Sequence, residues 1–332
     1  MYILSAADIR RSVSMAQAVD AVADAFAQLS TGRATVPLRT SIAQAAHDSH
    51  SFFMPALLSG SAQSQPALGL KVVSVFPHNA ERHRLPAIHA LIALFDPATG
   101  VPLAVMDGRY LTALRTGASS GAASRVLARP DAHVLALFGA GAQAPFQALA
   151  VCAVRPIERI LIVNRTRQRA EQLCQTLTEH GLTAELRIAD SAQSALRNAD
   201  IVCCATSAST PIFDDADIRL GTHINGVGSF TAHMAEVPVA TIGRARVVVD
   251  QLEAAWAESG DLLNAQAAGR IDASRTDELG AVIAGKAPGR QSNEEITFFK
   301  SVGNAVQDLA VARLALSAAQ AAGLGIMMDL QT

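Results

Sequence analysis

Apolar and polar positions follow one pattern up to about residue 130 and another beyond it. An amphipathic helix is predicted for residues 14–29, because Val19, Val22 and Phe26 fall on one helical face. Ser14 and Gln17 form a capping-box pair at its start. Strand-like runs follow at 36–42, 51–54, 68–76 and 88–95, and a helical pattern returns at 109–128. This half predicts a mainly antiparallel sheet with helices.

Beyond residue 133, short apolar strands alternate with helical segments. We expect strands at 134–138, 159–164, 182–188, 200–206, 223–227 and 245–250. Alternation of this kind predicts a parallel, doubly wound sheet that is covered on both faces. Residues 285–300 are polar and turn-rich, and an alanine-rich helix follows at about 302–322. That helix is expected to pack on the first domain, because a six-stranded sheet is complete without it.

The predicted fold class is therefore α/β. A Rossmann-type doubly wound parallel sheet is expected over 119–301. A discontinuous α+β domain is expected from 1–118 together with 302–332.

Composition narrows the class of protein. The chain has 332 residues, 50% of them hydrophobic and 4% aromatic, with a net charge of −2. A core of this size excludes general disorder, and the charge gives no basis for binding nucleic acid or an anionic membrane. The four cysteines lack the spacing of a metal site, so we expect no metal and a reducing, cytoplasmic location. The uncharged stretch 134–154 contains Gly, Gln and Pro, which favours a buried strand, turn and helix over a membrane span.

The sharpest motif is a glycine turn between a strand and a helix. Gly139 and Gly141 are followed by Ala142, Gln143 and Ala144, which is the G-x-G-x-x-A pattern of a dinucleotide site. Gly139 permits the tight turn, and Gly141 lets the backbone approach a pyrophosphate at the helix N-terminus. The motif predicts that a nicotinamide dinucleotide binds here.

The end of the next strand bears on the choice of dinucleotide. Asn164, Arg165 and Thr166 stand where a site for NAD usually carries an acidic residue that accepts a hydrogen bond from the ribose. Arg165 can instead pair with a 2′-phosphate, to which Thr166 can donate. This favours NADPH, with NADH as the alternative.

Ionisable candidates come from the first domain, because the strand ends at Thr206 and at Gly228-Ser229 offer no strong acid or base. Lys71 lies in an otherwise apolar strand, and burying an unpaired ammonium is costly. It therefore faces a cleft or a partner, unless it belongs to an edge strand. Arg115 and Arg39 are two candidates for binding a carboxylate or a phosphate.

Taken together, these pieces resemble the ornithine cyclodeaminase/mu-crystallin family over nearly the whole chain. The matching pieces include Pro37-Leu-Arg39, Gly69-Leu-Lys71, Leu111 to Thr116, the glycine turn, Asn225 to Gly228 and Lys300 to Gly303. The resemblance implies a homodimer in which the discontinuous domain binds substrate and forms the dimer. It implies that Arg39, Met54, Lys71 and Arg115 meet the substrate. It further implies contact with the dinucleotide for Arg115, Thr116, Gly139, Gly141, Ala142, Gln143, Asn164, Arg165, Thr166, Thr206, Val227, Gly228, Ser229 and Ser301.

Two positions depart from the cyclodeaminases of that family. Those enzymes resemble this chain but carry an aspartate at the position of Ser229 and a glutamate at the position of Phe52. Without these carboxylates, proton transfer from an amine is disfavoured. The chain looks more like the reductases of Δ1-pyrroline-2-carboxylate and Δ1-piperideine-2-carboxylate, which implies an NADPH-dependent route to L-proline or L-pipecolate. Lys71 would be the catalytic proton donor, with His89 as the alternative donor.

Three other functions stay open at this point. They are ornithine cyclodeamination, an alanine or opine type of amino-acid dehydrogenase, and a non-catalytic NADPH-dependent ligand binder like mu-crystallin.

Overall fold

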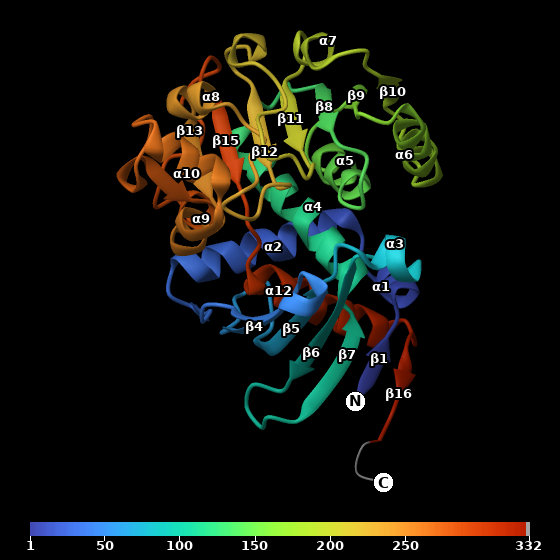
Figure 1. Ribbon diagram of the computed structural model, residues 1–332. Coiled ribbons are helices and arrows are strands. Elements are labelled where there is room, and N and C mark those ends of the chain that lie inside the picture. Colours follow the sequence, from blue (N-terminus) through green and yellow to red (C-terminus); the bar gives the residue numbers. More distant parts are fainter. Residues whose placement is uncertain (330–332) are drawn as a thin grey trace. The chain divides into compact units, whose positions relative to one another are not determined.

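The computed structural model describes residues 1–329, which divide into two compact units (Figure 1). Unit 1 comprises Met1–Arg115 and the segment that begins at Asn304, and unit 2 comprises Thr116–Gly303. The division falls within helix α4, Gly108–Leu127, so consecutive residues of one helix belong to different units. The roles that the sequence suggested for the two domains stay predictions.

Unit 1 is built on a mainly antiparallel sheet of eight strands, as predicted. Its order is β16-β1-β7-β6-β5-β4-β2, and β3 also pairs with β4. Only the contact of β1 with β7 is parallel among the described pairs of this sheet. The strands are β1 Tyr2–Leu4, β2 Ala34–Thr35, β3 Thr40–Gln44, β4 Ser49–Leu58, β5 Ala67–Val75, β6 Ile88–Phe95, β7 Pro102–Asp107 and β16 Ile326–Met327.

One predicted strand of unit 1 was wrong, and four strands, β1, β2, β7 and β16, were missed. Residues 36–42 do not form one strand, because the chain leaves the sheet between β2 and β3. Pro37 lies in that break and has no amide hydrogen for the ladder. β1 and β16 are too short for an alternating pattern to reveal them, and β7 begins at a proline.

Helices cover one face of this sheet. Helix α2, Met15–Ser30, begins at the predicted capping box of Ser14 and Gln17. Helix α12, Ala305–Ala321, packs against α2, β4 and β5 of unit 1. It begins at the cap Asn304, a little later than predicted. The remaining helices of unit 1 are α1 Ala6–Ser12 and α3 Asn79–His83.

Unit 2 is a parallel sheet in the order β10-β9-β8-β11-β12-β15-β13-β14, so the predicted doubly wound fold is confirmed. Its strands are β8 Val134–Phe138, β9 Arg159–Val163, β10 Glu185–Ile188, β11 Ile201–Cys204, β12 His223–Gly226, β13 Arg246–Val249, β14 Thr276–Glu278 and β15 Thr297–Lys300. Its helices are α5 Ala144–Cys152, α6 Arg167–Glu179, α7 Ala192–Leu196, α8 Val239–Arg244, α9 Leu252–Glu258, α10 Gly260–Ala267 and α11 Leu279–Ile283.

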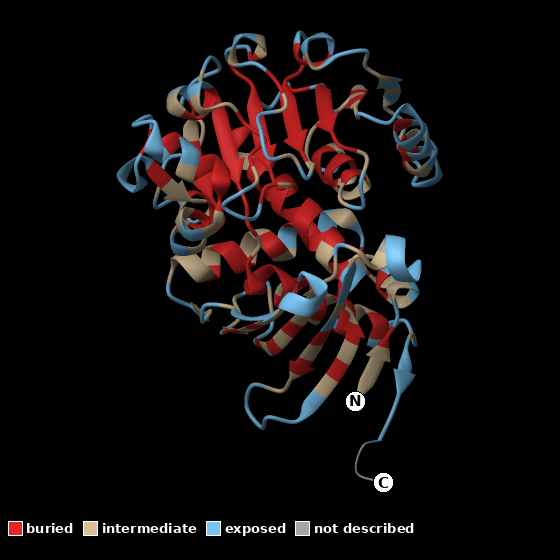
Figure 2. Cartoon of the chain, viewed as in Figure 1, coloured by how far each residue is buried: buried red, intermediate tan, exposed pale blue. Residues whose placement is uncertain are grey.

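The central strands of unit 2 are buried on both faces (Figure 2). Cys203 belongs to the core cluster on one face and its neighbour Cys204 to the cluster on the other. Both thiols are free and buried, as the alternation of side chains along a strand requires. Among residues 1–329, no helix combines the length and the apolar character needed to cross a bilayer.

The prediction of six strands for unit 2 was incomplete. β14 and β15 were missed, and β15 lies between β12 and β13 within the stretch that we expected to be turn-rich. Every residue of β15 is buried, including Thr297 and Lys300. The polar residues 290–295 before it masked a strand of four residues.

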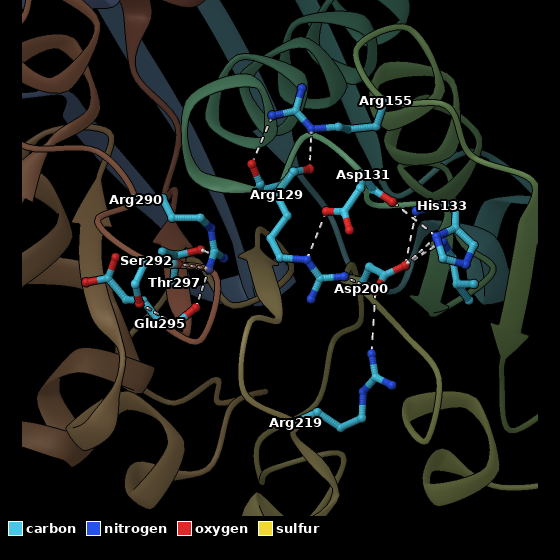
Figure 3. Close-up of polar contacts among 12 residues, drawn as sticks. Arg129, Asp131, His133, Arg155, Asp200, Arg219, Arg290, Ser292, Glu295 and Thr297 are labelled. Carbon is cyan, nitrogen blue, oxygen red and sulfur yellow. Dashed lines mark hydrogen bonds and ion pairs between the residues drawn. The ribbon is translucent and has the colours of Figure 1, made fainter.

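A cluster of arginines fixes the amino ends of the parallel strands (Figure 3). The buried carboxylate of Asp200 accepts hydrogen bonds from the amides of His133 and Val134 and from Arg129 Nη2 at 2.7 Å. Arg155 donates to carbonyl oxygens at the end of α4, including that of Ala128 at 3.0 Å. These donors are taken up by the protein's own acceptors, so this end of the sheet is held together by structural contacts.

Candidate functional site

In unit 1, the candidate site centres on Lys71. This residue lies in β5, which runs between β4 and β6, so the alternative of an edge-strand lysine is wrong. Its side chain is 2% exposed, and its Nζ lies 2.7 Å from Oδ2 of Asp308. Asp308 is in the first turn of α12 and is fully buried. A buried ammonium is thus paired with a buried carboxylate.

The same carboxylate also binds Arg115 from α4. Arg115 Nε donates to Asp308 Oδ1 at 2.9 Å, and its Nη1 donates to Oε1 of Gln307. Because the guanidinium can only donate, this contact fixes which end of the Gln307 amide faces it. One carboxylate therefore holds the two predicted cations in a single buried group of formal charge +1.

The surroundings of Lys71 bring its pKa close to physiological pH. Burial lowers the pKa of Lys71 to about 8, the charge of Asp308 opposes that shift, and Arg115 and Arg39 add to it. A lysine with such a pKa exchanges its proton at physiological pH, which an ordinary surface lysine does not.

The remaining candidates of unit 1 lie on strands near Lys71. Met54 is opposite Lys71 in the ladder of β4 with β5 and is buried. The Arg39 guanidinium stands 5.3 Å from the ring centre of Phe52, in a cation–π contact. His89 is an exposed residue of β6 paired with Ser74. The structure therefore gathers Met54, Lys71 and Arg115 in the interior, whereas His89 lies at the surface.

In unit 2, the glycine turn has the geometry that its motif predicts. Gly139 has a φ of +99°, and a Cβ there would come within 2.6 Å of the carbonyl oxygen of Ala205. At Gly141 a Cβ would meet nothing within 4 Å, so the turn opens toward free space at the start of α5. Ala142 is exposed, and the buried Oε1 of Gln143 has no hydrogen-bond partner among the described residues. The open turn and the helix N-terminus that follows it fit the phosphates of a dinucleotide, whereas the Gln143 oxygen is an acceptor and would need a donor.

Asn164 ties the end of β9 to this turn. Its Oδ1 accepts from the amide of Ala140 at 3.2 Å, and its Nδ2 donates to the carbonyl oxygen of Thr166 at 2.8 Å. Arg165 and Thr166 are exposed directly beyond it. Asn164 thus fixes the backbone that carries Arg165 beside the glycine turn.

A buried glutamate joins the loops that follow β11 and β12. Oε1 of Glu236 accepts from the amide and the hydroxyl of Thr206, at 2.7 and 2.8 Å. Its Oε2 accepts from the amides of Gly228 and Ser229, each at 2.9 Å. Burial raises the pKa of Glu236, but four donors face its two oxygens, which is the environment of a carboxylate. Two predicted cofactor loops are therefore held by one side chain.

Ser229 has no free hydroxyl for chemistry in this arrangement. Its side chain is fully buried, and its Oγ donates to the carbonyl oxygen of Met234 at 2.7 Å. Val227 beside it is 8% exposed. Ser229 therefore shapes the loop, and its hydroxyl proton is taken up by a backbone carbonyl.

One further buried ion pair and several buried hydrogen bonds support these loops. Asp261 accepts from the amide of Glu236 at 2.7 Å and from Nζ of Lys300 at 3.0 Å. Asp250 accepts from the hydroxyl of Ser301 at 2.8 Å and from the two amides that follow it. The carbonyl oxygen of Thr116 accepts from Nε2 of Gln147 at 3.3 Å. Ser301 and Thr116 are thus fixed near the two ends of unit 2 in the sequence.

The carboxylates that organise both groups were not predicted from the sequence. They are Asp308, Glu236, Asp261 and Asp250, together with the partners Gln307 and Lys300. The one available signal was a charge inside an apolar run, as with Asp308 in an alanine-rich helix.

Comparison with known proteins assigns the family. The sequence profile of the ornithine cyclodeaminase/mu-crystallin family matches residues 1–322. The chain belongs to this family. A Δ1-pyrroline-2-carboxylate reductase of Bacillus cereus is 40% identical over 98% of both chains. The family resemblance inferred from the sequence is thereby confirmed.

Solved structures of the family agree with the fold. The Δ1-pyrroline-2-carboxylate reductase of Thermococcus litoralis, in complex with NADH and L-proline, superimposes with a TM-score of 0.92 at 39% identity. The match covers 99% of this chain and 100% of that one. A dimeric archaeal alanine dehydrogenase with bound NAD matches at 33% identity with a TM-score of 0.89, over 99% of both chains.

Proposed function

We propose that this member of the ornithine cyclodeaminase/mu-crystallin family is an NAD(P)H-dependent reductase of cyclic ketimines. Its substrates are Δ1-pyrroline-2-carboxylate and Δ1-piperideine-2-carboxylate, and its products are L-proline and L-pipecolate. The observation that carries the proposal is the buried group of Lys71, Arg115 and Asp308, because it joins a proton donor to an excess of positive charge. The names of the Bacillus cereus and Thermococcus litoralis reductases support the same reaction, and so does the L-proline bound to the second of them.

The residues of unit 1 have different roles in binding the substrate and in supplying its proton. Arg115 uses Nε and Nη1 within the protein, which leaves Nη2 for the substrate carboxylate, and Arg39 adds a second positive charge. Lys71 Nζ carries the proton that the imine nitrogen takes up. Met54 lies across the ladder from Lys71 and contributes an apolar wall for the ring. Bound NAD(P)H supplies the hydride that C2 accepts.

The residues of unit 2 would hold that cofactor. Gly139, Gly141, Ala142 and Gln143 face the phosphates, and Thr206, Val227, Gly228, Ser229 and Ser301 form the loops beyond the strands. Thr116, at the first position of the unit, completes the set. Asn164 holds Arg165 and Thr166 for the ribose, where an arginine in place of a carboxylate favours NADPH over NADH.

We further propose that the protein is a homodimer that pairs through the outer face of the sheet of unit 1. Alternate residues of β4 to β7 on that face are apolar and half-buried or exposed, whereas the other face contacts α12 (Figure 2). Register pairs place them side by side. They are Phe53, Pro55, Leu57, Leu68, Leu70, Val72, Leu91, Ala93, Phe95 and Val105. A continuous apolar face of this kind is typical of an interface, and the archaeal relative is a dimer.

One spectrophotometric panel tests the reaction. NADPH and NADH are each combined with pyrroline-2-carboxylate, piperideine-2-carboxylate, and pyruvate with ammonia, and L-ornithine is assayed with NAD. We expect NADPH oxidation with the two cyclic imines and little with pyruvate. Release of ammonia from ornithine would instead indicate a cyclodeaminase. Binding of NADPH without turnover on any arm would indicate a ligand binder.

A further inference from the structure

Three of the 27 basic residues of the chain are lysines, namely Lys71, Lys286 and Lys300. Lys71 and Lys300 are buried, and each is paired with a buried aspartate. Arginine carries the positive charge almost everywhere else in this sequence. Arginine does not release its proton in proteins, whereas a buried lysine does. The choice of lysine at position 71 therefore indicates that its proton is used.

Asp308 contacts both cations of the site. Its Oδ2 lies 2.7 Å from Nζ of Lys71, and its Oδ1 accepts from Nε of Arg115 at 2.9 Å. The two partners come from a strand and a helix more than a hundred residues away from α12 in the sequence, and all three side chains are nearly or fully buried. No other carboxylate within residues 1–329 pairs with Lys71 in the structure.

We propose that Asp308 is a positioning residue with two effects. It keeps Lys71 protonated, and it holds Arg115 so that the guanidinium binds the substrate anion while Lys71 supplies the proton. This rests on the proposed reductase function. With Asp308 ionised, Lys71 keeps its proton beside Arg115, although two positive charges at close range repel each other. Gln307, the next residue along α12, holds the guanidinium from a second side. Arg115 then binds the anion while Lys71 gives up its proton.

Proton balance follows from this arrangement. During reduction, the Nζ–H bond of Lys71 breaks and an N–H bond forms at the imine nitrogen, while C2 gains the hydride and the nicotinamide is oxidised. Lys71 becomes neutral next to the Asp308 carboxylate, which favours the return of a proton from water. Removing that carboxylate leaves the amine as the stable form of Lys71.

The small number of lysines permits a direct test that does not depend on turnover. In protein labelled with 13C at lysine Cε, NMR resolves three signals, and each is followed through a pH titration. Lys286 is exposed and serves as the internal reference. We expect Asp308→Asn to lower the midpoint of the Lys71 signal by at least one pH unit and to leave the Lys300 signal unchanged.

A second substitution is expected to shift the titration midpoint of Lys71 in the opposite direction. Arg115→Gln removes a positive neighbour, so the Lys71 midpoint is expected to rise. It also serves if Asp308→Asn does not fold. Asp261→Asn is the matched control, because it removes the other buried partner and should perturb Lys300 alone.

A Lys71 midpoint that is the same in native protein, Asp308→Asn and Arg115→Gln would overturn the proposal. Measurements of turnover then distinguish a failure of the proposed reaction from a failure of the proposed role of Asp308. If the midpoints move as expected but no cyclic imine is reduced by the native protein, the proposed reaction is wrong and the electrostatic role of Asp308 stands. If imines are reduced, the activity of Asp308→Asn should decline at a lower pH than that of the native protein. Asp308→Glu should restore part of the activity at high pH.

Discussion

Lys71 determines the pH range in which the protein is expected to act. Its pKa is lowered by burial to about 8, and the protonated form is the donor. We therefore predict that kcat/KM for imine reduction is lost as the pH rises through about 8, well below the ordinary titration range of lysine. Rates measured between pH 6 and 10 check this. Lys71→Arg keeps the charge but does not release its proton, so its turnover should fall about 100-fold or more at every pH.

Arg165 is the residue on which cofactor choice is predicted to depend. Arg165→Asp should raise KM for NADPH about 10- to 100-fold, because a hydrogen bond to a charged group contributes about 1.5–3 kcal/mol. KM for NADH should change little. Arg197→Asp, at an exposed arginine beyond α7, is the control and should alter neither value. Equal losses for both cofactors would show that Arg165 does not read the 2′-phosphate.

At this scale, sequence reasoning finds residues whose chemistry contradicts their surroundings. Lys71 was recognisable because it interrupts an apolar strand, and Gly139 because its motif needs a positive φ. The pairing of Asp308 with Arg115 was not recognisable, because the two residues are 193 apart in the sequence. Only the fold brings such pairs together, and no local pattern encodes the partner of a buried charge.

At the scale of elements, strand identity was predictable wherever a strand was long or was bounded by a recognisable turn. β8 with the following glycine turn is such a case. β15 is not, because its four buried residues follow a polar segment and reveal no period. The strand predicted at 36–42 overlaps β3 only at residues 40–42, because the apolar pattern runs on across Pro37, where the chain has left the sheet.

Glu236 links two loops, so we predict that Glu236→Gln affects stability and cofactor binding together. The amide can accept at one atom only, and its own N–H groups face the donors of Thr206 or of Gly228 and Ser229. We expect a loss of about 1–3 kcal/mol in the free energy of unfolding and weaker binding of the nicotinamide cofactor. Urea unfolding and fluorescence titration measure the two effects. Glu253→Gln, at an exposed position of α9, should leave both unchanged.

At the scale of the whole molecule, the outer face of the sheet of unit 1 determines assembly in our proposal. Leu70→Glu and Leu91→Glu each place a charge on that face, opposite apolar neighbours of the adjoining strands. We predict that either variant sediments as a monomer, because a buried unpaired charge costs several kcal/mol. Gln63→Glu, in an exposed loop of the same unit, should keep the native mass. A monomeric native protein would contradict the proposed homodimer.

The division of the chain between Arg115 and Thr116 falls inside one continuous helix, α4, where no local pattern marks it. The contacts of Asp200 with Arg129 and Arg219 were not predictable from the sequence, since these arginines are 71 and 19 residues away from it (Figure 3).

The scarcity of lysine also has a practical consequence. Lys286 is the exposed lysine of the chain and lies beyond α11 in unit 2. Lys71 is buried in unit 1, and Lys300 is buried in unit 2. Amine-reactive dyes or coupling resins would meet a single lysine side chain on the folded protein. Molecules coupled through a lysine would then share one attachment point, in the unit that carries the glycine turn.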